Sequence, residues 1–270
     1  MNILCIGDIV GKPGRQAIEK LLGPLKEEFQ IDCAVVNAEN AAGGSGVTSR
    51  MSRFFFRMGC DVLTLGDHVW DQKELQEYLD KEPRIVRPAN FPEGQGIPGK
   101  GLQFYTTEKG VKIAVINLLG RTFMRYQVDC PFRKFQLLYE EAIKETPIVI
   151  VDFHAETTSE KVAFGWFADG LASIVFGTHT HIQTADERVL PKGTAYITDL
   201  GMSGPYDSVI GQQKENIILR FMKSMPVKFH VAEKDVRLSG IVVKVDESSG
   251  RATAIERIQR CLPEEEDGKN

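Results

Sequence analysis

Short apolar segments alternate with longer amphipathic segments along the first third of the chain. The apolar runs predict buried strands at Ile3–Ile6, Ala34–Val36 and Val62–Leu65. The amphipathic stretches between and after them predict helices at Arg15–Phe29, Ser49–Met58 and Lys73–Asp80. An alternation of strand and helix is typical of an α/β fold with a parallel sheet.

The rest of the chain is less regular, but it adds further elements. A hairpin is predicted from Gln103–Tyr105 and Val111–Ile116 around Glu108-Lys109-Gly110, and two more strands at Ile148–Phe153 and Ser173–Phe176. Helices are predicted at Phe135–Lys144 and Asn216–Met222. The last quarter has β-like runs that predict a second, more antiparallel sheet, at Val227–Val231, Leu238–Val245 and Thr253–Ile258.

The candidate functional residues come directly after predicted strands. They are Asp8, Glu39 with Asn40, Asp67 with His68, and His154. In open α/β sheets, ligands bind in the crevice outside the carboxyl ends of the strands, so we expect these side chains to converge.

A His-x-His pair follows the strand predicted at Ser173–Phe176. In an extended segment, His179 and His181 project to the same side and can reach a shared centre. Imidazole and carboxylate are the ligands expected for Zn, Mn or Fe, and no cysteine occurs in these clusters, which argues against a closed structural zinc site. The pattern therefore favours an open, catalytic metal site.

Each candidate residue also has a structural interpretation when it is taken alone. Asp8 could cap the following helix, because helix N-termini favour Asp. Glu39-Asn40 could cap or turn the chain, and His154 could be a hydrogen-bonded core histidine. The glycines between Gly7 and Gly14 match neither a Walker nor a Rossmann pattern, so they are interpreted as turn formers.

Composition and charge restrict the class of protein. The 270 residues are 42% hydrophobic and 26% charged, which excludes wholesale disorder, a collagen-like repeat and a coiled coil. A net charge of −4 without a basic stripe argues against binding of long nucleic acid. No apolar run approaches the roughly 20 residues of a membrane span, and the first residues lack the pattern of a secretory signal. Five cysteines without a C-x-x-C pair add to the prediction of a reducing cytoplasm.

Seven stretches of this chain resemble the YmdB-like metallophosphoesterases. They are Gly7–Gly11, Asn37–Ala42, Arg87–Pro92, Asp152–Glu156, Gly177–His181, Gly193–Asp199 and Gly201–Asp207. The resemblance implies an α/β calcineurin-type fold, a two-sheet sandwich flanked by helices in four αββα layers. It also implies two metal ions, commonly Fe with Mn or Zn as alternatives, hydrolysis of 2′,3′-cyclic nucleotides or related phosphodiesters, and a possible homo-oligomer. We expect residues 1–262 to form one such domain and 263–270 an acidic tail.

The resemblance also assigns roles to the candidate residues. Asp8, Asn40 and His181 would bind one metal ion, and Asp67, His154 and His179 the other. Glu39 would bridge both ions, a metal-bridging hydroxide would attack the phosphorus, and His68 would donate a proton to the leaving oxygen. Asp152, Glu156 and Asp199 are available to hydrogen-bond the ligating imidazoles. Val10 stands where most calcineurin-like enzymes have a histidine, and Asn40 would fill that gap.

One departure from the family pattern affects the charge of this centre. The family has Gly-Asn-His where this chain has Gly66-Asp67-His68. An ionised Asp67 lowers the formal charge of a two-metal centre by one, which weakens the attraction for a phosphate diester and makes a bridging water less acidic. We therefore expect Asp67 to favour a ferric ion or to lower the activity.

Other functions compete with this interpretation. A metal- and nucleotide-binding regulatory protein with weak or no turnover is favoured by Asp67. In an amidohydrolase barrel the His-x-His pair belongs to the first strand, whereas here it lies about two-thirds of the way along the chain. A purely structural interpretation leaves the polar clusters as caps and turns.

Overall fold

The computed structural model describes residues 1–92 and 94–263, and its first sheet combines parallel and antiparallel strands. The strand order is β2-β12-β13-β1-β3-β4-β5, and β14 pairs with β13. The parallel part contains β1 (Asn2–Ile6), β3 (Cys33–Asn37), β4 (Val62–Thr64) and β5 (Ile85–Val86). The other strands are β2 (Asp8–Ile9), β12 (Met202–Pro205), β13 (Val236–Val245) and β14 (Ala252–Cys261). Strand β13 runs antiparallel to β1.

The second sheet is built from the middle of the chain in the order β10-β11-β9-β8-β7-β6. Its strands are β6 (Leu102–Thr106), β7 (Lys112–Leu119), β8 (Val149–His154), β9 (Ile174–Thr178), β10 (Arg188–Val189) and β11 (Ala195–Ile197). Strands β7, β8, β9 and β11 are parallel, while β6 and β10 are antiparallel at the two edges.

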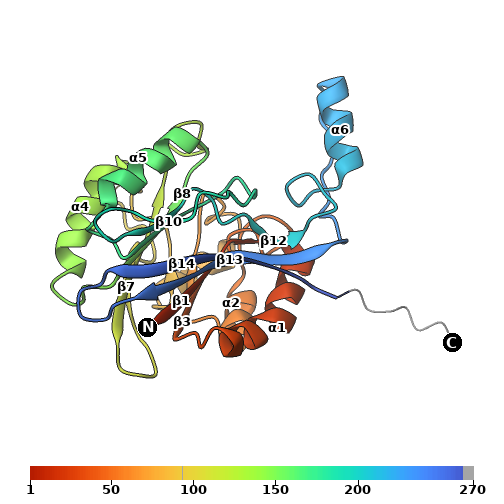
Figure 1. The fold of residues 1–270 in the computed structure, drawn as a ribbon. Coiled ribbons are helices and arrows are strands. Elements are labelled where there is room, and N and C mark those ends of the chain that lie inside the picture. The colour runs from red at the N-terminus through yellow and green to blue at the C-terminus, as the bar shows by residue number, and fades with distance from the viewer. Residues whose placement is uncertain (93, 264–270) are drawn as a thin grey trace.

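Helices lie on the outer faces of both sheets (Figure 1). The first sheet is covered by α1 (Gly11–Glu28), α2 (Ser49–Arg57) and α3 (Lys73–Leu79). The second is covered by α4 (Pro131–Ala142) and α5 (Thr158–Ala168). Helix α6 (Lys214–Lys223) stands away from these layers.

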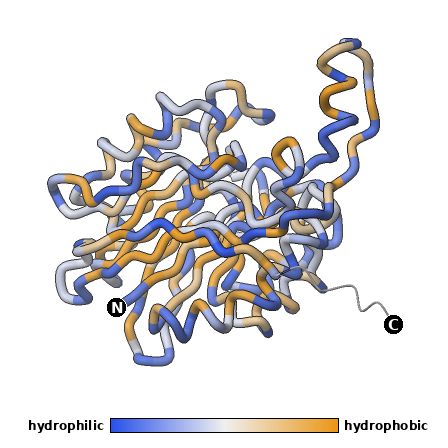
Figure 2. Tube along the Cα trace, turned by 45° about the vertical axis from the view of Figure 1, so that its right-hand side comes forward, coloured by the Kyte–Doolittle hydropathy of each residue, from blue (hydrophilic) through white to orange (hydrophobic). Residues whose placement is uncertain are grey.

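Alternate residues of the strands enter different cores, which explains the four layers. In β1, Ile3 and Cys5 pack between the two sheets, while Leu4 and Ile6 pack against the helices of the first sheet. Figure 2 shows these apolar strands inside the molecule. Strands buried on both faces appear as continuous apolar runs in the sequence, as the first third of the chain does. The predicted αββα sandwich is confirmed.

The predicted placement of the last strands is wrong. Leu238–Val245 and Thr253–Ile258 do lie in β13 and β14, but these strands extend the first sheet beside β1 instead of forming a second one. Val227–Val231 forms no strand and contributes only an isolated bridge from Val231 to Gln212. Strand pairing depends on partners distant in sequence, which periodicity does not specify.

Several helix boundaries also differ from the prediction, whereas the predicted hairpin forms. Helix α1 begins at Gly11 instead of Arg15, because Pro13 is tolerated in a first turn, where backbone N–H groups have no intrahelical partner. Strands β6 and β7 pair as predicted. Among the described residues, no helix is both long and apolar enough to cross a bilayer. Residues 264–270 of the predicted acidic tail lie outside the described residues.

Candidate metal centre

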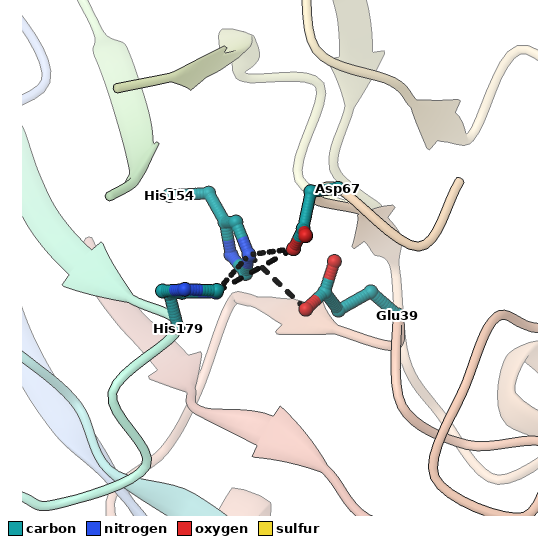
Figure 3. A group of neighbouring side chains, drawn as sticks. All are labelled: Glu39, Asp67, His154 and His179. Carbon is teal, nitrogen blue, oxygen red and sulfur yellow. Dashed lines mark hydrogen bonds and ion pairs between the residues drawn. The ribbon is translucent and has the colours of Figure 1, made fainter. Parts of the chain in front are cut away.

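Carboxyl ends of strands from both sheets bring the candidate residues together. Glu39 and Asp67 follow β3 and β4 of the first sheet, while His154 ends β8 and His179 follows β9 of the second. One ligand atom from each of these four residues lies within 4.8 Å of the other three (Figure 3). Convergence at the strand ends, as expected from the sequence, is observed.

His154 lies at the middle of this cluster and is fully buried. Its Nε2 atom is 3.1 Å from Glu39 Oε1, 3.2 Å from Asp67 Oδ1 and 3.0 Å from His179 Nδ1. On the other side of the ring, Nδ1 lies 2.8 Å from Thr178 Oγ1, and that hydroxyl donates to Asp152 Oδ1 at 2.6 Å. Thr178 must therefore accept from His154 Nδ1–H, which leaves Nε2 as the ring nitrogen that faces the carboxylates.

A second group of candidates surrounds Asp8, which is also fully buried. The backbone N–H of His179 donates to Asp8 Oδ2 at 3.2 Å, but Asp8 Oδ1 has no hydrogen-bond partner. His181 Nε2 lies 3.9 Å from Asp8 Oδ1, and the Asn40 amide lies 3.2 Å from the same imidazole nitrogen. His181 Nδ1 donates to the Ile210 carbonyl oxygen at 2.9 Å, which leaves Nε2 facing this group. A buried carboxylate oxygen without a partner is unfavourable, so the site is suited to a cation.

The two groups share Glu39. Its Oε1 atom accepts from Asn40 Nδ2 at 3.0 Å and faces His154, and its Oε2 atom accepts from the backbone N–H of His68 at 3.2 Å. Glu39 thus contacts both groups through its side chain, and His179 does so through its backbone N–H to Asp8 and its ring to His154. Glu39, Asp67, His154 and His179 could hold a cation, and Asp8, Asn40 and His181 place further donor atoms beside them.

The predicted geometry of the His-x-His pair is wrong. His179 and His181 have φ angles of 97° and 65°, so the segment is a turn and not an extended strand. The two imidazoles face different partners, since His179 meets His154 while His181 meets Asn40. Asp199 holds this turn, because its Oδ2 atom accepts from the Thr180 backbone N–H and hydroxyl at 3.2 and 2.7 Å.

Packing and capping account for Asp8 and His154 only in part. Asp8 does not cap α1, because Val10 occupies the N-cap and no side chain caps that end. His154 is a buried histidine with a satisfied Nδ1, as the structural interpretation expected. Its Nε2 atom, however, points into a group of carboxylates, which packing alone does not explain.

Burial and the close spacing of three carboxylates shift the pKa values of the residues in this cluster. Burial raises the pKa of Asp8. Burial alone would lower the pKa of His154, but Glu39 and Asp67 outweigh it and raise that pKa well above its ordinary value. Burial would raise the pKa of Asp67, but hydrogen bonds from His154 and His179 outweigh it and hold that pKa below its usual range. The carboxylates thus favour positive charge at His154 Nε2, which a proton or a metal ion would supply.

Gly66 is a site residue that the sequence reasoning missed. A Cβ atom at this position would lie 2.0 Å from Glu39 Oε2 and 2.5 Å from His154 Nε2. Any side chain at Gly66 would therefore displace two candidate ligands. The available signal was a glycine directly between the apolar end of a strand and Asp67.

His68 lies beside the cluster and is held by a second carboxylate that was also missed. Its Nδ1 atom is 2.7 Å from Asp71 Oδ2 and 3.1 Å from Ser45 Oγ. Arg125 Nη1 donates to Asp71 Oδ1 at 3.0 Å. Although burial tends to raise the pKa of Asp71, hydrogen bonds from Ser45, His68 and Arg125 lower it. The signal in the sequence was an acidic residue three positions after the histidine.

The three acidic residues expected behind the imidazoles have different roles in the structure. Glu156 Oε2 contacts His179 Nε2 directly at 3.1 Å. Asp152 reaches His154 only through Thr178. Asp199 contacts none of the candidate imidazoles among its described contacts, and pairs instead with buried Lys161 at 2.6 Å.

Comparisons with known proteins match almost the whole chain to one family. The family profile of the YmdB-like protein matches residues 4–258. The chain is 51% identical over 258 residues to the 2′,3′-cyclic-nucleotide 2′-phosphodiesterase of Bacillus subtilis strain 168, covering 96% of both proteins. It is similar to the crystal structure of a novel phosphatase from Mycoplasma pneumoniae, with a TM-score of 0.90 and 36% identity over 97% of this chain and 93% of that one. A hypothetical protein from Thermus thermophilus gives a TM-score of 0.89 and 38% identity over 97% of this chain and 100% of that one.

Proposed function

The chain belongs to the YmdB-like protein family, and from this premise we propose that it is a metal-dependent phosphodiesterase that hydrolyses 2′,3′-cyclic nucleotides or related phosphodiesters. The observation that carries the proposal is the convergence of Glu39, Asp67, His154 and His179 within 4.8 Å. A relative of 51% identity that is named for this activity supports the same substrate class.

The donor set supports a centre of two metal ions. Asp8, Asn40 and His181 would hold one ion, Asp67, His154 and His179 the other, and Glu39 would bridge them. Asp8 Oδ1, which has no hydrogen-bond partner, would be satisfied by a cation at the first position. Oxygen and imidazole donors without thiolate suit iron, and they also suit manganese and zinc. When bound, two such ions bind the phosphoryl oxygens and lower the pKa of a water molecule towards neutrality.

The chain's own residues orient the substrate and move a proton. His68 would act as the proton donor to the leaving oxygen, which in a 2′,3′-cyclic nucleotide is a ribose oxygen. Asp71 and Ser45 hold its Nδ1 side, so the ring presents its other nitrogen to the cavity that it lines. Thr178 and Asp152 fix the ring of His154, while Glu156 contacts that of His179.

The experiment that tests this function couples elemental analysis to a substrate panel on one preparation. The purified protein is analysed for Fe, Mn and Zn and then assayed with 2′,3′-cyclic nucleotides, 3′,5′-cyclic nucleotides and linear diesters. We expect bound metal and hydrolysis of the 2′,3′-cyclic compounds. A protein that contains metal and binds a cyclic nucleotide tightly but forms no product would support the regulatory alternative, which Asp67 favours through the lower charge of the centre.

The proposal also covers the cellular location, the size of the substrate, the domain and the oligomeric state of the protein. All five cysteines are free, which supports a reducing, cytoplasmic location. The net charge of −4 supports a small substrate over long nucleic acid. The candidate metal ligands come from both sheets, which supports a single domain over residues 1–262. Exposed Ile218 and Leu219 on α6 and Met225 just after it are compatible with a homo-oligomer.

A further inference from the structure

A cavity of about 520 Å³ opens beside the candidate metal centre. One part of its lining is polar and contains His68, His179 and His181. Another part is apolar and is formed by Ile210, Ile217, Phe221 and Phe229, which we call the apolar wall. The volume falls in the range of small-molecule sites, which are mostly apolar with a few polar groups that fix orientation.

Helix α6 supplies part of the apolar wall from one of its faces. Ile217, Arg220 and Phe221 are spaced by three and four residues, so they lie on the same side of the helix, and all three line the cavity. Ile217 is buried, whereas Phe221 remains 79% exposed although it lines the cavity. Figures 1 and 2 show that α6 stands out from the layered body and has apolar segments along it.

The apolar wall is joined directly to the candidate metal ligands. The carbonyl oxygen of Ile210 accepts the hydrogen bond from His181 Nδ1 at 2.9 Å, so the wall begins at the residue that orients His181. A group bound at the wall would therefore be close to a phosphate bound at the metal centre. In a 2′,3′-cyclic nucleotide only the ribose separates the phosphate from the base.

Arg220 and Phe229 give the wall a flat, cationic element. The Arg220 guanidinium carbon lies 5.1 Å from the centroid of the Phe229 ring. Arg220 is the only Arg or Lys in the described lining of the cavity, and no ion pair of its side chain occurs within the described chain. Guanidinium planes and aromatic rings are the surfaces on which nucleic-acid bases stack.

Building on the function proposed above, we propose that the apolar wall, with Arg220, is the binding subsite for the base of the nucleotide. The anionic phosphodiester is attracted to the metal centre, and the flat base is the remaining part of the substrate that an apolar surface binds. Every base has an aromatic face, so stacking here would select for the presence of a base more than for its identity. The subsite would thus distinguish nucleotides from phosphodiesters without a base.

The test compares two substrates in wild-type protein and in Phe229→Ala. The substrates are adenosine 2′,3′-cyclic phosphate and ribose 2′,3′-cyclic phosphate, which lacks the base. We expect the ratio of their kcat/KM values to fall by about fivefold or more in Phe229→Ala, mainly through KM for the nucleotide. Phe229→Tyr, which keeps an aromatic ring, should restore the ratio.

Met222→Ala is the matched control, because Met222 is 78% exposed on the same helix but does not line the cavity. In Met222→Ala the ratio of the two kcat/KM values should stay within about twofold of the wild-type ratio, because a surface substitution has a small effect. An equal loss for both substrates in Phe229→Ala, the same loss in Met222→Ala, or a change of oligomeric state without a change of ratio would overturn the subsite.

A binding measurement separates this inference from the proposed function. If wild-type protein hydrolyses both compounds equally well, the subsite is refuted while the phosphodiesterase stands. If it hydrolyses neither, the phosphodiesterase is refuted, and calorimetry with adenosine 3′-phosphate and inorganic phosphate decides the subsite. Weaker binding of adenosine 3′-phosphate alone in Phe229→Ala supports the subsite, and unchanged binding contradicts it.

Discussion

Asp71 Oδ2 lies 2.7 Å from Nδ1 of His68, and Arg125 and Ser45 hold the same carboxylate. His68 is three residues earlier on the chain, in the turn after β4, and its backbone N–H donates to Glu39. The candidate proton donor is therefore fixed both to Glu39 and to an acidic side chain that controls which ring nitrogen faces the cavity.

Replacing His68 with Ala should lower kcat by about 10²- to 10⁴-fold, the usual contribution of a general acid. Metal content, measured by elemental analysis, should remain as in wild type, because other side chains form the donor set. His230→Ala is the matched control, since His230 is exposed on the segment after α6. Loss of metal from His68→Ala would make His68 a ligand instead of a proton donor.

Replacing Asp71 with Asn tests its role as a positioning residue. The amide can keep a hydrogen bond but removes the negative charge and allows the imidazole to rotate. We expect kcat to fall by about tenfold, with KM and metal content close to wild type. A matching fall in metal content would instead indicate a general disturbance of the site.

Replacing Asp67 with Asn introduces the residue that the family resemblance implies for this position. The change removes one negative charge from the donor set, so an all-divalent centre should become more favourable. We expect turnover with Mn(II) to rise severalfold, and spectroscopy on anaerobically purified protein should detect ferric iron in the wild type only. An all-divalent wild-type centre together with unchanged turnover in Asp67→Asn would contradict this hypothesis.

Removal of metal should destabilise the fold. Without a cation, Asp8 Oδ1 is buried without a partner, and the charges of Asp8, Glu39 and Asp67 lie close together. Metal at about 1,000 times its Kd stabilises the folded state by about 4 kcal/mol. Calorimetry should therefore show a Tm about 10 °C higher for metal-loaded protein than for chelated protein. In Asp8→Asn this difference should shrink, whereas an identical difference would exclude metal binding at Asp8.

Residues that are close in sequence were predictable because their signals are local. Asp8, Glu39 and Asp67 each follow an apolar run, and the buried parallel strands β1, β3 and β4 form where these runs occur. The turn at His179 and His181 was not predictable, because Asp199, some twenty residues later, supplies the hydrogen bonds that hold it. Gly66 and Asp71 were missed because their importance depends on which side chains pack against them.

The sequence by itself determined the kinds of donor atoms, their order along the chain and the strands that carry them, since hydrophobic periodicity and polar strand ends are local properties. The tertiary structure alone decided that β13 pairs with β1, that His154 faces Glu39 and Asp67, and that α6 supplies a wall of the cavity. These relationships join residues separated by large parts of the chain. They arise because strands pair and sheets pack in three dimensions. Each strand or sheet packs against the partner whose apolar surface fits its own.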